Sequence, residues 1–136
     1  MADLYLDIVS PSKSVFQGII KSVTVPGTKG RFQILINHAP IVSTFEIGMI
    51  RVDLNNKSDY YATGGGTVEV LDNQITLLAD SIELTEDIDV DRAMNAKKRA
   101  EERLASKSAD INVLRAQAAL QRALNRLSIK DKYLKN

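Results

Sequence analysis

The chain has 136 residues, 44% of them hydrophobic and 26% charged, which fits a small globular domain with an appendage and excludes bulk disorder and collagen. It has no Cys, one His and no Trp, so disulfides, thiolate nucleophiles, zinc ribbons and iron-sulfur clusters are excluded and a histidine-rich metal centre has no ligands. The net charge of +1 argues against nucleic acid as the main partner, because phosphate binding requires a concentrated basic surface.

No apolar run approaches the roughly 20 residues that a membrane-spanning helix needs. The first residues include Asp3 and Asp7, where a signal or transit peptide would carry basic residues before an apolar stretch. We therefore expect a soluble protein that acts where it is made.

The composition changes after Leu84. Residues 1–84 carry 6 Lys or Arg and 9 Asp or Glu, whereas residues 85–136 carry 12 Lys or Arg and 8 Asp or Glu. All seven Gly and all three Pro precede residue 67, and the remainder is rich in the helix formers Ala, Arg, Lys, Leu and Glu. The sequence predicts two domains, residues 1–84 and residues 85–136.

The first domain reads as short apolar or alternating segments separated by turn residues. No helical pattern interrupts them, which is typical of an antiparallel β-sandwich or barrel. The predicted strands cover residues 4–9, 15–16, 19–25, 34–36, 48–54, 59–63, 67–71 and 74–78.

The second domain reads as two helices. Apolar residues recur at steps of three and four from Val90 to Leu104, and again from Ile111 to Ile129, with a break at residues 106–110. A connection this short makes the helices antiparallel neighbours. Their facing stripe is mostly Ala, so the hairpin buries little area and should be only marginally stable by itself.

Three features before residue 85 invite a functional reading, and a structural one is more economical for each. Gly64–Gly66 lacks the following Lys and helix of a phosphate loop, so a bulge or close backbone approach is favoured. Residues 26–31 can cradle an anion but resemble a hairpin turn. His38 has no Asp, Ser or Cys near it in sequence to activate, which favours a surface or partner contact over catalysis.

The acids Asp87, Asp89 and Asp91 alternate before the first helix. Calcium binding by an EF-hand would need Gly and Glu where Arg92 and Lys98 stand, so a charged helix start is the better interpretation.

Arginines recur on both predicted helices. Spacings of seven and four place three of them on one face of each helix, Arg92, Arg99 and Arg103 on the first and Arg115, Arg122 and Arg126 on the second. A solvated charged face is the usual explanation of such a pattern. The alternative is that the two stripes converge on a polyanion, because guanidinium groups suit phosphate geometry.

Short motifs in a characteristic order cover essentially the whole chain: residues 6–11, Phe16 with Gly18, residues 27–30, Ile34 and Leu35 with residues 38–40, residues 48–51, Gly65 and Gly66 with residues 68–70, and Leu78 with Ala79. The most specific is Ile88-Asp89-Val90-Asp91-Arg92-Ala93. In this order they resemble the epsilon subunits of bacterial F-type ATP synthases, called delta in mitochondria.

The resemblance implies a ten-stranded sandwich that binds the gamma shaft and rests on the c-ring, followed by a regulatory two-helix hairpin. Such a protein has no active site or catalytic cofactor and lies at the cytoplasmic face of the bacterial inner membrane, attached only through the complex with its alpha and beta subunits. The hairpin of such proteins folds compactly or extends along gamma and blocks rotation in the direction of hydrolysis.

The resemblance also implies site residues. ATP as a regulatory ligand would contact Glu83, Ile88, Asp89, Arg92, Ala93, Arg99, Arg122 and Arg126. We expect the arginines to hold phosphates, Asp89 to meet the adenine amino group or orient Arg92, and Glu83 to tie the ligand to the sandwich side. Acidic beta-subunit segments would meet Arg115, Arg122, Arg126 and Lys130, and Arg31 and His38 would face the c-ring or gamma.

Arg31 departs from the family pattern, because it replaces an acid on a loop that the family directs toward the ring. A different class of protein is a free-standing sandwich module that dimerises through Leu120, Leu124 and Leu127. An enzyme is a third class, for which the strand-rich part offers only scattered acids and one His.

Overall fold

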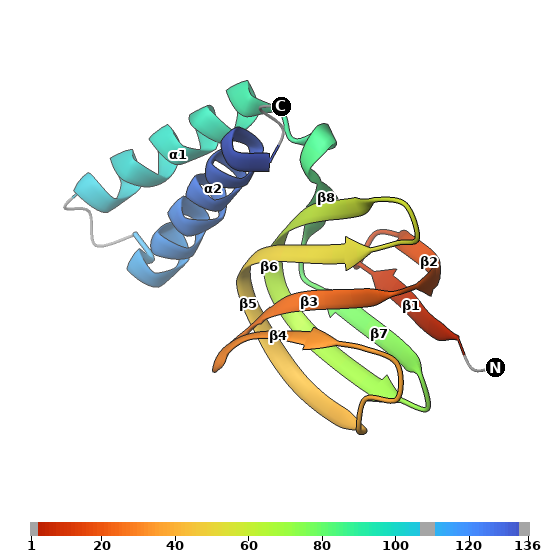
Figure 1. The fold of residues 1–136 in the computed structure, drawn as a ribbon. Coiled ribbons are helices and arrows are strands. Elements are labelled where there is room, and N and C mark those ends of the chain that lie inside the picture. Colours follow the sequence, from red (N-terminus) through yellow and green to blue (C-terminus); the bar gives the residue numbers. More distant parts are fainter. Residues whose placement is uncertain (1–2, 107–110, 134–136) are drawn as a thin grey trace. The chain divides into compact units, whose positions relative to one another are not determined.

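The computed structural model describes residues 3–106 and 111–133, and the part of the predicted helix break at residues 107–110 lies outside them. The chain divides into two compact units, Met1–Leu84 and Thr85–Asn136 (Figure 1). Each unit is described by itself.

The first unit is built of strands that follow one another along the chain without an intervening helix (Figure 1). Eight strands are present among the described residues: β1 Leu4–Val9, β2 Ser14–Ile20, β3 Ser22–Gly27, β4 Gly30–Ile34, β5 Ile41–Asp53, β6 Ser58–Leu71, β7 Gln74–Ala79 and β8 Ile82–Leu84.

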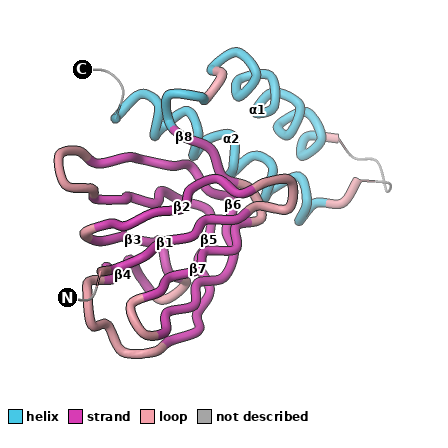
Figure 2. Tube along the Cα trace, turned by 90° about the vertical axis from the view of Figure 1, so that its right-hand side faces the viewer, coloured by secondary structure: helices cyan, strands magenta, loops and turns pink. Residues whose placement is uncertain are grey.

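Hydrogen bonds join these strands in the order β2-β1-β7-β6-β5-β3-β4, and β8 pairs with β6. Figure 2 shows them lying side by side, connected by short loops. Most pairs are antiparallel, as the sequence predicts, but β1 pairs with β7 in parallel, with Leu6 opposite Ile75. A parallel pair needs a long connection between its strands, and here five other strands supply it.

The strand count is eight where the resemblance implies ten, because two strands are long. β5 and β6 pair continuously from Ile41 opposite Val70 to Asp53 opposite Ser58. The glycine triplet that seemed to separate two strands therefore lies inside β6.

The triplet marks the place where β6 changes partners. Tyr61–Thr63 pair with β8, whereas Gly66 and the residues after it pair with β7. Gly65 has a φ of 103°, and a Cβ on Gly66 would overlap the carbonyl oxygen of Leu78 and lie 2.9 Å from the Cα of Ala79. The predicted close backbone approach is confirmed, and it explains why a residue without a side chain is needed there.

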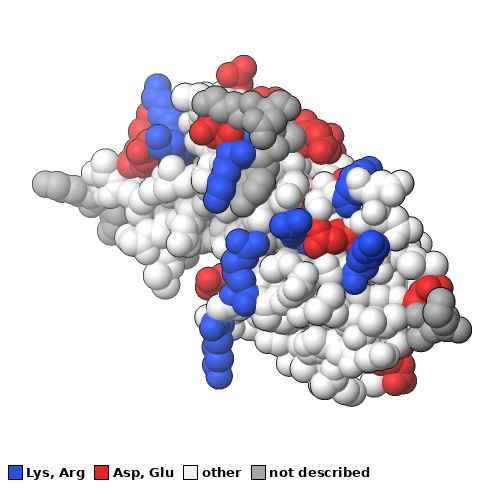
Figure 3. Space-filling model, viewed as in Figure 1, with Lys and Arg blue, Asp and Glu red and all other residues white. Residues whose placement is uncertain are grey.

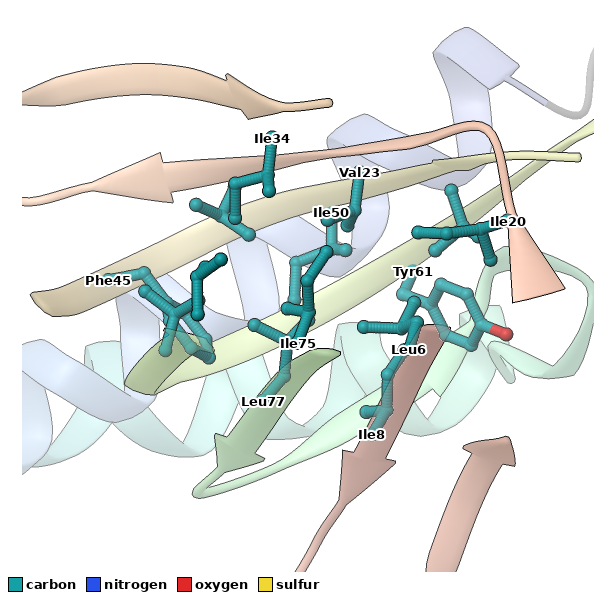
Figure 4. Close-up of a cluster of buried hydrophobic side chains, with 14 of the residues drawn as sticks. Leu6, Ile8, Ile20, Val23, Ile34, Phe45, Ile50, Tyr61, Ile75 and Leu77 are labelled. Atoms are coloured by element: carbon teal, nitrogen blue, oxygen red, sulfur yellow. The ribbon is translucent and has the colours of Figure 1, made fainter. Parts of the chain in front are cut away.

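Branched aliphatic side chains fill the interior of the first unit, and Figure 4 shows them converging from several strands. In β1 and β7 they alternate with less buried residues, which is the pattern of a strand with one face toward the interior. The buried cluster consists of Leu4, Leu6, Ile8, Ile20, Val23, Val25, Ile34, Phe45, Ile50, Val52, Tyr61, Val68, Val70, Ile75, Leu77 and Ala79.

The second unit is helical. It begins with the 3-10 turn η1, Thr85–Asp87, and continues with α1, Val90–Ala105, and α2, Val113–Tyr133. The two helices pack against each other, which confirms the predicted hairpin (Figure 1). In the described part of the chain, no helix is long and apolar enough to cross a membrane.

Candidate functional site

The seam between the two helices is made of alanines. Ala93 and Ala100 on α1, and Ala116 and Ala123 on α2, are buried and repeat at intervals of seven residues. Because a methyl group is the smallest apolar side chain, the two backbones can approach closely, but each contact removes little apolar area from water. The Ala-rich stripe predicted from the sequence thus holds the hairpin together weakly.

Each helix begins with a capping residue. The carboxylate of Asp89 accepts a hydrogen bond from the backbone N–H of Arg92 at 3.1 Å, and the side-chain oxygen of Asn112 accepts one from that of Arg115 at 3.1 Å. These bonds satisfy amide groups that have no partner inside the helix. The predicted helix start at the acids is confirmed, whereas α2 begins two residues later than Ile111 because Asn112 is the cap.

Six arginines have similar positions relative to this seam. Arg92 and Arg99 each directly precede a buried alanine of α1, and Arg115 and Arg122 each directly precede a buried alanine of α2. In an antiparallel pair of right-handed helices, equal offsets from the seam lie on the same side of the pair. Arg103 and Arg126, four residues after Arg99 and Arg122, lie on that side too.

We call this the arginine side of the hairpin; of its six arginines, Arg92, Arg99, Arg122 and Arg126 are the four predicted to contact ATP. The antiparallel arrangement puts the start of α1 beside the end of α2, so Arg92 and Arg126 belong to one end of the seam and Arg99 and Arg122 to its middle. Arg92 and Arg99 are exposed, whereas Arg122 and Arg126 are half-buried. Guanidinium groups on one side of two helices can together hold an anion with several oxygens.

The other residues predicted to contact ATP have different surroundings. Ile88 and Ala93 are both buried, and Ala93 is one of the four alanines of the seam. Asp89 is an exposed cap. Glu83 is half-buried in β8, opposite Ala62, and belongs to the first unit.

Lys130 lies in the last turns of α2, among the residues predicted to meet a beta subunit. Its Nζ atom donates hydrogen bonds to the backbone carbonyls of Thr85, at 3.1 Å, and Glu86, at 3.2 Å. Nothing in the local sequence indicated this contact. Arg115, predicted for the same role, is exposed in the first turn of α2.

Arg31 and His38 lie in the first unit on either side of the end of β4. Arg31 is exposed and, with Lys29, lines an open hollow of about 610 Å3 between the β3–β4 turn and the start of β5. His38 is half-buried, and its Nδ1 is 2.7 Å from the carbonyl oxygen of Ala39.

The loop that carries His38 is fixed by its neighbour. The backbone N–H of Asn37 donates to the side-chain oxygen of Asn73 at 2.6 Å, and the Asn73 amide donates back to the Asn37 side chain at 3.2 Å. Asn37 and Asn73 both have positive φ, which Asn tolerates better than most residues. The pair ties the β4–β5 loop to the β6–β7 turn.

A polar network surrounds Asp53 at the end of β5. Its carboxylate accepts hydrogen bonds from Ser58 at 2.6 Å, Ser22 at 2.8 Å and Arg51 at 2.8 Å. Burial acts to raise the pKa of Asp53, but these three hydrogen bonds and the charge of Arg51 together lower it below its ordinary value. The network holds β3, β5 and β6 in register and has no partner-binding feature of its own.

Charges of both signs cover the surface. Figure 3 shows acidic and basic side chains interspersed over the helices and separate basic side chains on the sandwich. Within residues 3–106 and 111–133, no three His, Asp or Glu side chains gather as a metal site would require.

The leucines of the alternative dimer interface do not form one exposed stripe. Leu120 and Leu127 are half-buried, whereas Leu124 is 44% exposed. A dimer through all three would compete with the packing of the hairpin itself.

The fold defines a class: a β-sandwich domain followed by an antiparallel helical hairpin with arginines along one side. Comparison with family models identifies the family within this class. Residues 3–85 match the ATP synthase Delta/Epsilon chain β-sandwich domain, and residues 86–131 match the corresponding long α-helix domain. The chain belongs to the ATP synthase delta/epsilon chain family, as the resemblance predicted.

Relatives in bacteria match over almost their whole length. The ATP synthase epsilon chain of Nitratidesulfovibrio vulgaris strain DP4 is 45% identical over 127 residues, 93% of this chain and 95% of the relative. That of Desulfitobacterium hafniense strain Y51 is 47% identical over 123 residues, 90% and 92% of the two chains. That of Bacillus licheniformis is 39% identical, covering 95% and 98%.

Two solved structures share the fold. A chain of the Euglena gracilis mitochondrial ATP synthase superposes with a TM-score of 0.80 at 19% identity, covering 94% of this chain and 81% of that one. A chain of the Tetrahymena thermophila mitochondrial ATP synthase gives a TM-score of 0.58 at 18% identity, covering 98% and 96%.

Proposed function

We propose that the chain is a central-stalk subunit of an F-type ATP synthase, in which the sandwich connects the gamma shaft to the c-ring and the hairpin restrains ATP hydrolysis. The observation that carries the proposal is the match of both units, in order, to chains named ATP synthase epsilon chain. The Tetrahymena neighbour is described as central stalk and c-ring, which supports the same placement. Such a subunit is peripheral to the membrane and acts at its cytoplasmic face as part of the complex, contributing no catalytic residues.

The sandwich supplies the contacts with the rotor. We assign Arg31 and His38 to them because one borders an open hollow and the other stands on a loop that the Asn37–Asn73 pair holds in place. Purified gamma should retain the full chain and the 1–84 fragment equally. Loss of binding by the fragment would move the rotor contact to the hairpin.

The hairpin supplies the inhibition. Its excess of basic residues suits acidic segments of the beta subunits, with Arg115, Arg122, Arg126 and Lys130 as contacts. Removing residues 88–136 should raise ATP hydrolysis by the reassembled motor. Added salt should relieve inhibition by the full chain, because the Debye length is about 10 Å at 0.1 M. Hydrolysis that is unchanged in both comparisons contradicts this role.

The arginine side supplies a regulatory ATP site. Four guanidinium groups on one side of the hairpin can meet a triphosphate that would favour the folded hairpin over an extended one. The ligand is bound and not hydrolysed, with Asp89 available to its nucleoside end. Glu83 lies in the first unit, and its contact with the ligand stays a prediction.

Calorimetry tests this site. Arg92→Ala and Arg126→Ala should each weaken ATP binding about ten- to a hundredfold, the effect of losing one charge-assisted contact. Lys98→Ala is the matched control, since Lys98 is an exposed cation of α1 that lies away from the arginine side. Absence of heat at millimolar ATP, or equal affinity in all four proteins, refutes the site.

A further inference from the structure

Lys130 extends the seam-facing row of α2 past the level at which α1 begins. It lies seven residues after Ala123, which lies seven after Ala116, so the three residues form one row along the helix. α1 begins only at Val90, and the partner that faces α2 at this level is therefore the turn η1, which contacts α2. A half-buried ammonium thus occupies the place where the preceding positions of the row hold alanine.

The contact made by this ammonium links distant parts of the chain. Lys130 donates to the carbonyls of Thr85 and Glu86, which are 45 and 44 residues away in sequence. The Thr85 carbonyl also accepts from the backbone N–H of Ile88 at 3.3 Å, so it belongs to the turn that leads into α1. A cation that donates to backbone carbonyls forms a charge-assisted bond, stronger than a bond between neutral groups.

We infer that Lys130 is the latch that keeps the hairpin folded onto the turn at its base. The seam buries four alanines, and α2 buries one large aliphatic residue, Ile129, directly before Lys130, so a charge-assisted contact at the open end of the seam adds to a limited apolar contribution in holding α2 in place. Breaking it loosens the end of α2 and the turn η1 together, because the same two hydrogen bonds join both.

The latch deepens the proposed function and, in this step, rests on it. The ammonium of Lys130 uses two of its three N–H groups on Thr85 and Glu86 in the folded hairpin, and these bonds compete with pairing to a carboxylate of a beta subunit. In this proposal Lys130 stabilises the folded state through the two carbonyls or the extended state through a carboxylate, so the two contacts oppose each other.

Amide hydrogen exchange on the full chain, without partners, tests the latch. Lys130→Met keeps the length of the side chain and removes the ammonium. It should accelerate exchange about tenfold, a change of about 1.4 kcal/mol, both at the Ile88 amide and in the last turns of α2. The sandwich amides should not change. Lys130→Arg retains a donor and should stay near the wild-type rates.

Lys98→Met removes the same charge from an exposed position of the same hairpin and should leave these rates unaltered. Equal rates in Lys130→Met and Lys98→Met overturn the latch, as does acceleration confined to α2 with the Ile88 amide unaffected. Titration of the same variants with ATP, or their effect on hydrolysis by the motor, tests the proposed function separately, because the exchange result does not depend on either.

Discussion

The two units of this chain are stabilised on different scales. In the sandwich, long aliphatic side chains such as Leu6, Ile50 and Ile75 are fully buried. Among the described side chains of α1 and α2, the buried ones are four alanines and a single large aliphatic residue, Ile129. At about 25 cal/mol per Å2 of apolar surface, each leucine or isoleucine contributes several times more than an alanine methyl.

This difference fits the function proposed above, in which the sandwich keeps its shape and the hairpin changes between two states. In the hairpin, the caps Asp89 and Asn112 and the contact of Lys130 add directional hydrogen bonds to this limited packing.

The largest expected effect is in the sandwich core. Leu77→Ala should lower the free energy of unfolding by about 2–5 kcal/mol, because Leu77 is fully buried in β7. Leu78→Ala changes the next residue, which faces the other way and is 53% exposed, and should cost about 0.5 kcal/mol or less. Urea unfolding measures both. Similar losses in the two variants would contradict the assignment of the core face.

The glycine triplet gives the next largest effect. Gly66→Ala should cost about 1–3 kcal/mol, because the new methyl overlaps the carbonyl oxygen of Leu78 on the neighbouring strand. In Gly18→Ala the nearest atom is a Phe16 ring carbon at 3.4 Å, so this control should unfold close to wild type. If Gly66→Ala is as stable as Gly18→Ala, the close approach of β6 and β7 is wrong.

In the hairpin, loss of the Asp89 cap is expected to lower the stability of α1. Asp89→Ala removes the side chain that accepts from the Arg92 amide and should destabilise α1 by about 1 kcal/mol. Asp91→Ala keeps the cap and removes a first-turn acid, for which a smaller loss is expected. Exchange rates of the α1 amides, read together with those of the sandwich, show whether the effect stays within the hairpin. An equal response of both units would mean that they unfold as one.

The smallest expected effect is a loss of folding stability at low pH. Because the folded-state pKa of Asp53 is lowered, its contribution is present above the ordinary pKa of about 4 and is lost as the pH falls through the folded value. We expect this contribution to be about 1 kcal/mol or less. Between pH 6 and pH 3, wild type should lose more stability in urea than Asp53→Asn. Parallel losses would show that the network does not favour the ionised carboxyl.

Much of this fold is predictable because local patterns reflect it. Turn residues mark most strand ends, and the step of three and four in the tail marks both helices. The number of predicted segments equals the number of strands, but the bounds of the strands were not predictable from these signals. The glycines inside β6 look like a boundary in sequence and act as a change of partner in space, and the start of β5 and the whole of β8 have no predicted segment. The parallel pairing of β1 with β7 joins segments about 70 residues apart and has no local signature.

The candidate site was likewise predictable only in part. The spacing of the arginines predicts that they share a face on each helix, and the buried alanines then put all six on one side of the hairpin. The hydrogen bonds of Lys130 depend on where α2 ends relative to η1, which periodicity does not set. The pairing of Asn37 with Asn73 likewise depends on two loops meeting in space, although Asn in a turn is a recognisable signal.

The central claim is that the sandwich is complete without the hairpin. Urea unfolding of the 1–84 fragment, followed by amide NMR and compared with the full chain, tests it most directly. The account predicts dispersed amide signals and one cooperative transition, with a midpoint close to that of the sandwich in the full chain. A fragment with neither dispersed signals nor a cooperative transition would show that the two units form one cooperative structure.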